Sequence, residues 1–209
     1  MIKITNVETF GWREAIIGMR NPMNSWEMSD TDFTIPMRGK YDEPRIGERD
    51  YKLMSTLSKA GPDHGKYLRM IQVGLDICGP LYWWKEFDTY KVGTIANSCS
   101  TMHKIHAKEF VLDDFSHEHL DEQNIELLNC LIDRMNLYRT YFLKDKNKDD
   151  WWQLIQLLPS SYNQTRTVVV NYQVLKNIYH ARKNHKLDEW VVFCKFIESL
   201  PYSELITND

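Results

Sequence analysis

A dense run of small polar side chains lies near the middle of the 209-residue chain, between residues 87 and 103. Its glycine, amide and hydroxyl residues are Gly93, Asn97, Ser98, Ser100 and Thr101. Residues of these types leave backbone N–H groups and hydroxyls available to a ligand, especially to an anion. The same composition is also typical of an ordinary connection between a helix and a strand, in which the polar residues only form turns. The segment is therefore a candidate site loop, with a plain connection as the alternative.

A second group of residues could bind an anion through positive charge. Arg166 begins a predicted strand and Arg182 ends a predicted helix, and Lys183, His185 and Lys186 follow directly. Arginines at the ends of rigid elements suit bidentate binding of a phosphate. A surface cluster that complements the negative end of a helix would give the same pattern. Both interpretations stay open at this point.

Two histidine pairs raise the question of a metal. They are His103 with His106, and His117 with His119. Zinc requires three or four ligands that converge at about 2.0–2.3 Å, and this stretch is rich in solvated charge, so no metal site is expected. Ser100 lies near two of these histidines in sequence but has no G-x-S-x-G context, and no phosphate-binding glycine loop is present.

Composition sets the class of protein. With 43% hydrophobic and 12% aromatic residues, the chain can build a real core. A net charge of −3 argues against broad adhesion to nucleic acid. No apolar run reaches the roughly 20 residues needed to cross a bilayer. The four cysteines are scattered, which favours free thiols in a reducing cytoplasm: Cys78, Cys99, Cys130 and Cys194.

The hydrophobic pattern predicts mixed helices and strands in a single domain over residues 1–209. An edge strand is expected at 1–10, and further strands at 68–77 and 165–171. Helices are expected at 14–20, 49–59, 80–87, 122–143, 151–158, 172–181 and 187–200. A charged linker is expected at 144–150, and residues 103–118 are expected to be partly irregular. The irregular stretch 21–48 is expected to be an arm or lid that packs through Trp26, Phe33 and Met37.

The order of these pieces resembles the flavin-dependent thymidylate synthase family over residues 50–190. In that family an Arg-His-Arg triplet precedes the signature Ser-x-Asn-Glu-x-Ser-x-Arg-Tyr. Here Thr89-Tyr90-Lys91 takes the place of the triplet, and residues 95–103 take the place of the signature. Asn97 and Ser100 match the signature, whereas Ile95, Ser98, Met102 and His103 replace its first serine, glutamate, arginine and tyrosine.

The C-terminal part matches the family better. Leu158-Pro159 stands where the family has Leu-Pro, and Val169-Val170-Asn171 stands where it has Thr-Val-Asn. The helix that follows contains Asn177 and ends at Arg182, which matches the family's nucleotide-binding arginine. Arg166 lies one residue out of register with a second substrate arginine. The histidines expected to contact flavin correspond to His64 and His185.

The resemblance implies an α+β fold, with a small antiparallel sheet flanked by long helices, and a homotetramer with sites shared between subunits. Members of the family use FAD, NADPH and methylenetetrahydrofolate to methylate dUMP, so most of the chemistry belongs to the cofactor. Ser100 would be the catalytic position that orients the base. The implied nucleotide-binding residues are Arg182, Arg166, Asn97 and Ser98, and the implied flavin-binding residues are His64, Tyr90, Lys91, Asn171, Asn177 and His185.

The departures from the family pattern leave three functions open. Losing two charge-assisted contacts, each of about 1.5–3 kcal/mol, would weaken binding by about two to four powers of ten. The first function is a divergent thymidylate synthase acting on a pyrimidine nucleotide. The second is a non-catalytic protein that sequesters or senses a nucleotide on the same scaffold. The third is an oligomeric structural protein whose tryptophans, Trp83, Trp84, Trp151 and Trp152, form a core or an interface.

Overall fold

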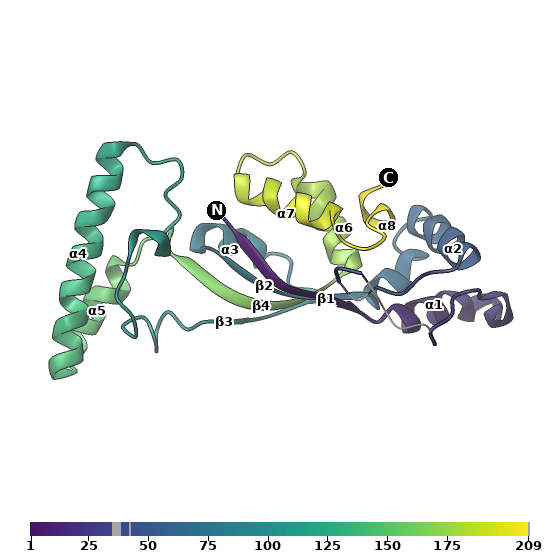
Figure 1. The fold of residues 1–209 in the computed structure, drawn as a ribbon, viewed down its shortest axis with the longest axis horizontal. Coiled ribbons are helices and arrows are strands. Elements are labelled where there is room, and N and C mark those ends of the chain that lie inside the picture. Colours follow the sequence, from purple (N-terminus) through teal and green to yellow (C-terminus); the bar gives the residue numbers. More distant parts are fainter. Residues whose placement is uncertain (35–38, 42, 209) are drawn as a thin grey trace. The chain divides into compact units, whose positions relative to one another are not determined.

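The computed structural model describes residues 1–34, 39–41 and 43–208 (Figure 1). The chain forms two compact units. One unit comprises Met1–Lys3, Ile77–Thr89 and Asn97–Arg166, and the other comprises Ile4–Asp76, Tyr90–Ala96 and Thr167–Asp209. The expectation of one domain over residues 1–209 stays a prediction. Among the described residues, no helix combines the length and the apolar character needed to span a bilayer.

The chain forms one small antiparallel sheet of four strands, and both units contain residues of this sheet. Its strands are β1 (Lys3–Phe10), β2 (Gln72–Pro80), β3 (Thr94–Ser98) and β4 (Asn163–Asn171), in the order β1-β2-β4-β3. β1 and β3 are therefore the edge strands, as predicted for the N-terminus. The mixed architecture confirms the predicted α+β fold class.

The first unit, residues 77–89 and 97–166 with the N-terminus, is built mainly from helices that flank its part of the sheet. They are α3 (Leu81–Phe87), the 3-10 turn η4 (Leu112–Asp114), α4 (Glu122–Asp145) and α5 (Lys148–Leu157). α4 and α5 pack side by side (Figure 1). They enclose an apolar cluster made of Ile105, Phe110, Phe115, Leu128, Ile132, Met135 and Leu154. Asp121 accepts a hydrogen bond from the Asn124 amide at 2.9 Å and so begins α4.

The second unit contains the remaining helices. They are α1 (Trp12–Arg20), α2 (Glu48–Lys59), α6 (Tyr172–Arg182), α7 (Asp188–Glu198) and α8 (Glu204–Thr207), with 3-10 turns η1 (Asn21–Met23), η2 (Trp26–Met28) and η3 (Gly65–Arg69). Trp12 is fully buried and meets Tyr172 and Tyr202 edge to face at 5.3 and 5.6 Å between ring centroids. Its indole Nε1 donates to Thr9 Oγ1 at 2.9 Å, which satisfies the buried donor.

A buried ion pair anchors the described part of the irregular arm. Arg20 Nε lies 2.7 Å from Asp50 Oδ1, and both side chains are almost fully buried. Asp50 Oδ2 also accepts hydrogen bonds from the hydroxyls of Ser29 and Thr31, at 2.7 and 2.6 Å. Burial by itself raises the pKa of Asp50, but the hydrogen bonds from Thr31, Ser29 and Arg20 outweigh it and lower the pKa.

Several sequence expectations need correction. The candidate site loop at 87–103 contains strand β3, because Cys99 N donates to Thr165 O and extends the pairing beside β4. The strand expected from residue 68 begins only at Gln72, since residues 65–69 form η3.

The linker expected at 144–150 is only two residues long. Lys146 ends α4 in a left-handed conformation, with φ of 53°, and Asn147 accepts from the Asp149 amide to begin α5. The charges that suggested a linker therefore belong to helix ends.

The described part of the arm is mostly irregular, as predicted, but Trp26 is 49% exposed and does not anchor it. Its indole donates to Asn21 Oδ1 at 2.8 Å within the same turn. Met37 lies outside the described residues. α8 was not predicted.

Candidate functional site

Three of the predicted site residues meet around one buried tryptophan of the second unit. Arg182, at the end of α6, donates from Nε to the hydroxyl of Tyr90 at 2.9 Å. Its guanidinium carbon lies 4.8 Å from the ring centroid of Trp190, which is fully buried at the start of α7. We call Tyr90, Arg182, His185 and Trp190 the Trp190 cluster. It fixes the orientation of the guanidinium plane, which is the preorganisation that a bidentate phosphate contact requires.

His185 belongs to this cluster through its ring and its backbone. Its ring centroid lies 6.3 Å from that of Trp190, and its amide donates to Arg182 O at 3.0 Å. Its Nδ1 accepts from the Leu187 amide at 3.2 Å. In the neutral ring the proton is therefore on Nε2.

Asn171 has a structural role that the sequence did not predict. Its side-chain oxygen accepts from the Val174 amide at 3.0 Å and begins α6, and its Nδ2 donates to Gly93 O at 3.4 Å. Gly93 has φ of +85°, and a Cβ there would lie 2.5 Å from Asn171 Nδ2. Asn171 thus ties the segment that carries Tyr90 to the helix that carries Arg182.

Two other predicted flavin-binding residues lie at the surface of the same unit. Lys91 is exposed beside Tyr90. Asn177 is exposed on α6, where its Oδ1 accepts from Gln173 Nε2 at 3.1 Å. The structure gives neither of them a contact with Arg182.

His64 lines a separate apolar cavity of the second unit. The cavity has a volume of ≈ 530 Å³. Met19, Met70 and Tyr67 form part of its wall, and Lys66 stands with His64 among its polar residues. Its size is within the range of about 300–1,000 Å³ that holds small organic ligands.

The signature segment, residues 95–103, belongs mostly to the first unit. Its predicted site residues have different surroundings from one another. Asn97 and Ser98 lie in strand β3 and are exposed. Ser100 Oγ accepts from the amides of Met102 and His103, at 3.2 and 2.9 Å, as in a turn-forming serine. Ser100 also lines a cavity of ≈ 240 Å³ with Cys99 and Lys104.

Arg166 is occupied by contacts within the first unit. Its Nη1 lies 2.7 Å from Asp88 Oδ1, its Nε donates to Gln164 Oε1 at 3.0 Å, and its guanidinium carbon lies 4.2 Å from the ring centroid of Trp84. Asp88 is 48% exposed, so this ion pair is accessible to solvent and to competing anions. A phosphate would compete with Asp88 for Nη1 of Arg166.

The histidines considered as metal ligands have other surroundings. His117 Nδ1 lies 2.8 Å from Phe115 O, and His106 packs edge to face on Phe142 at 4.7 Å. Throughout residues 1–34, 39–41 and 43–208, no group of three or more ligating side chains is arranged to hold a metal ion.

Sequence reasoning missed two features of these sites. Trp190 was noted only as part of a helix, yet both Arg182 and His185 pack on it. The apolar wall around His64 was also missed, because Met19 and Met70 are far apart in the sequence. The only local signal was the compact Gly61-Pro62-Asp63-His64-Gly65 turn, which holds His64 beside the helical residues.

The fold is that of the flavin-dependent thymidylate synthases. One similar solved structure is thymidylate synthase X (ThyX) from Helicobacter pylori with FAD and dUMP, at a TM-score of 0.69 and 16% identity over 99% of this chain and 97% of that one. Another is the flavin-dependent thymidylate synthase ThyX from Helicobacter pylori complexed with FAD and dUMP, at a TM-score of 0.66 and 17% identity over 97% of each chain. No protein-family profile matches this sequence, and no curated protein is similar to it in sequence.

Proposed function

We propose that this chain is a divergent thymidylate synthase-like protein that binds FAD and a pyrimidine nucleotide, and that it methylates dUMP with methylenetetrahydrofolate and NADPH. The observation that carries the proposal is the Trp190 cluster. Tyr90 and Arg182 are 92 positions apart, and the resemblance aligned them independently with two family motifs, yet they share a hydrogen bond. The fold of the whole chain supports the same function.

Arg182 would bind the phosphate of the nucleotide. Because its Nε donates to Tyr90, the phosphate would be bound through the two terminal amino nitrogens. Such a charge-assisted contact contributes about 1.5–3 kcal/mol. Asn97, Ser98 and the catalytic position Ser100 would orient the base, since amide and hydroxyl groups can both donate and accept.

The residues around His64 and the Trp190 cluster fit a flavin nucleotide. The cavity at His64 is mainly apolar and has a volume of ≈ 530 Å³, which suits a flat aromatic ring system. His64, Tyr90, Lys91, Asn171, Asn177 and His185 would hold the cofactor. Bound FAD would supply the redox chemistry, with electrons from NADPH. The chain's own residues would orient both ligands and exclude water.

A visible absorption spectrum of the freshly purified protein, with mass spectrometry of what it releases on denaturation, tests the cofactor part. A yellow protein that releases FAD, and that oxidises NADPH only when dUMP is present, is the expected result. A colourless protein that takes up no added FAD at high concentration would contradict the proposal.

A specific observation favours a second function, a non-catalytic nucleotide-binding protein that sequesters or senses its ligand. Arg166 is already bound by Asp88 and stacked on Trp84, so one of the two arginines implied for the nucleotide is engaged within the chain. Thr89 and Met102 also replace two cations of the family motif. In that case dUMP binds but no turnover follows.

The homotetramer implied by the resemblance, and a cytoplasmic location, belong to the same proposal. The supporting observation is that β3 is an edge strand on which Ile95 is 74% exposed, so one sheet edge is open to another chain. Light scattering coupled to size-exclusion chromatography measures the mass in solution. A protein that stays monomeric at all concentrations would contradict the shared-site arrangement.

A further inference from the structure

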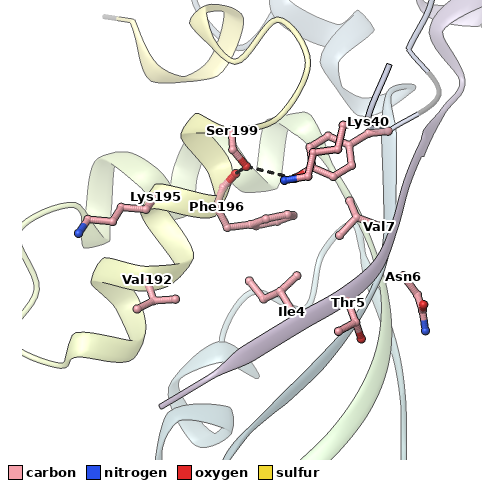
Figure 2. A pocket seen from close by; sticks show the side chains of 10 residues that line it. Ile4, Thr5, Asn6, Val7, Lys40, Val192, Lys195, Phe196 and Ser199 are labelled. Atoms are coloured by element: carbon pink, nitrogen blue, oxygen red, sulfur yellow. Dashed lines mark hydrogen bonds between the residues drawn. The ribbon is translucent and has the colours of Figure 1, made fainter. Parts of the chain in front are cut away.

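A groove on the second unit has no role in the proposed function. It lies between strand β1 and helix α7 and has a volume of ≈ 490 Å³. Figure 2 shows Ile4 of β1 and Phe196 of α7 pointing toward one another across it. Lys40 and Lys195 lie toward opposite ends of the groove in the same view.

The wall of the groove combines apolar and cationic groups. Ile4, Val7, Val192 and Phe196 are half-buried aliphatic or aromatic residues that form its apolar part. Both lysines are exposed, and within the part of the chain that the structure describes neither forms an ion pair. Among the residues that the structure describes, no aspartate or glutamate lines the groove. Such a wall favours a molecule with an apolar body and a negative charge.

The end of the groove at Lys40 also offers a hydroxyl donor. Ser199 donates its only hydroxyl proton to Phe196 O at 2.8 Å, so Tyr41 is the donor in its 3.4 Å contact with Ser199. A contact of that length is weak, and a carboxylate is a better acceptor than a hydroxyl. Lys40 Nζ lies 4.9 Å from the centroid of the Tyr41 ring, which places a cation over the ring that carries this hydroxyl.

The backbone of β1 argues against a protein strand as the occupant. Asn6, in the middle of β1, has φ of 51°, which interrupts the regular alternation of the strand. Near the end of β1, the Thr9 amide already donates to Tyr41 O at 3.0 Å. An interrupted edge that is partly paired resists the addition of another strand.

We propose that this groove binds a small organic monoanion, a carboxylate on an aromatic or branched aliphatic body. The carboxylate accepts from Lys40 and from the hydroxyl of Tyr41. The apolar body lies between Ile4 and Phe196. Lys195 lies at the opposite end of the groove and contributes little to the binding of the anion. This site is separate from the Trp190 cluster and does not depend on the proposed function.

The test uses the full chain with 13C-labelled methyl groups and the probe 4-phenylbutyrate, followed by NMR. The methyl signals of Ile4, Val7 and Val192 are expected to shift in a saturable way. The neutral analogue 4-phenylbutan-1-ol, with the same apolar body, is expected to bind about tenfold more weakly, which corresponds to about 1.4 kcal/mol.

Variants of the groove residues identify which side chains bind the carboxylate of the probe. Lys40→Gln is expected to weaken 4-phenylbutyrate binding about five- to tenfold, and Tyr41→Phe about two- to fourfold, because the lost contacts are partly exposed. Lys195→Gln should weaken it less than about twofold. Lys186→Gln, an exposed lysine in the turn before α7, is the matched control and should change nothing. Lys40, Lys186 and Lys195 are exposed, whereas Tyr41 is buried, and Tyr41→Phe keeps its ring and removes only the hydroxyl. Unchanged methyl spectra of the unliganded variants show that they fold.

Four results would overturn the proposal. They are an absence of methyl shifts at millimolar probe, equal binding of the acid and the alcohol, equal loss in Lys40→Gln and Lys186→Gln, and displacement of the probe by dUMP. Broadening of the β1 signals with protein concentration alone would show a second copy in the groove and would also overturn it. Failure of FAD or dUMP to bind would leave these results unchanged, so the two proposals fail separately.

Discussion

The Trp190 cluster of the second unit contains Arg182 and the first unit contains Arg166; the resemblance aligned both arginines with nucleotide-binding arginines, but their neighbours differ. In the Trp190 cluster, Arg182 is oriented by a ring and a hydroxyl, in a pattern suited to holding an anion. In the first unit, beside the signature segment, Arg166 is bound by a carboxylate and stacked on Trp84. The presence of an arginine at the expected position therefore says little about binding until its neighbours are known.

The largest expected effect tests whether Trp190 is the centre of its cluster. Trp190→Ala should destabilise the protein by about 3–5 kcal/mol, because it removes a fully buried ring on which Arg182 and His185 pack. Trp152→Ala is the matched control, since Trp152 is 39% exposed on α5. Urea unfolding followed by circular dichroism gives both values. Equal losses of unfolding free energy in the two variants would contradict the central role of Trp190 in its cluster.

A smaller effect tests the connection between Tyr90 and Arg182 through Gly93. Gly93→Ala combines an unfavourable positive φ with a contact at 2.5 Å to Asn171 Nδ2, and should cost about 1–3 kcal/mol. Gly61→Ala has a similar φ of +99° but meets nothing within 4 Å, so it measures the backbone term alone. The difference between the two free energies of unfolding isolates the contact with Asn171. No difference would mean that Asn171 moves freely.

The ion pair of the first unit should have a modest effect on stability. Arg166→Ala is expected to lower the free energy of unfolding by about 1 kcal/mol, through loss of the Asp88 contact and of the stacking on Trp84. A double-mutant cycle with Asp88→Ala separates these two terms. A coupling of zero between the two positions would contradict the structural role assigned to the pair.

The two units should also respond to acid in different pH windows. Burial lowers the pKa of His106 below 6.5, and Lys146, Lys104 and Arg139 add to this effect. The folded state therefore binds this proton less readily than the unfolded state, and stability falls as pH drops from 6.5 through the lowered pKa. The pKa of Asp50 is lowered from 3.8, so its contribution is lost only at pH below 3.8.

His106→Leu checks the first window. Its unfolding free energy should change less than that of the unmodified protein between about pH 7.5 and about pH 5. An unchanged slope in the variant would show that another group causes the dependence. An NMR titration of the His106 ring measures its pKa directly.

Much of the fold could be predicted from the sequence, because apolar spacing marks helices of ordinary length. Pro80 and the following apolar run predicted a helix over 80–87, and α3 is observed at Leu81–Phe87 with Pro80 as the residue before it. β3 was missed because both of its faces are exposed, so Asn97 and Ser98 lack the alternation that marks a strand. The break between α4 and α5 depends on one left-handed residue, Lys146, which leaves no hydrophobic signal.

The site residues were predictable only as types and positions. The match of helix α6 to a family motif indicated Arg182, and the structure adds its contact with Tyr90. The partners of Arg166 could not be predicted, because Asp88 and Trp84 lie about 80 positions away, at separations of 78 and 82 residues. The partners of an arginine depend on such long-range neighbours.

Calorimetric titration with dUMP tests the central claim most directly, on the unmodified protein and on Arg182→Ala, Arg166→Ala and Lys183→Ala. The account predicts that Arg182→Ala weakens binding by about ten- to a hundredfold, that Arg166→Ala weakens it less than about threefold, and that Lys183→Ala, the exposed neighbour, leaves it unchanged. A large loss in Arg166→Ala with dUMP binding intact in Arg182→Ala would contradict it. That result would show that the nucleotide displaces Asp88 and that Arg166, in the first unit, binds the phosphate.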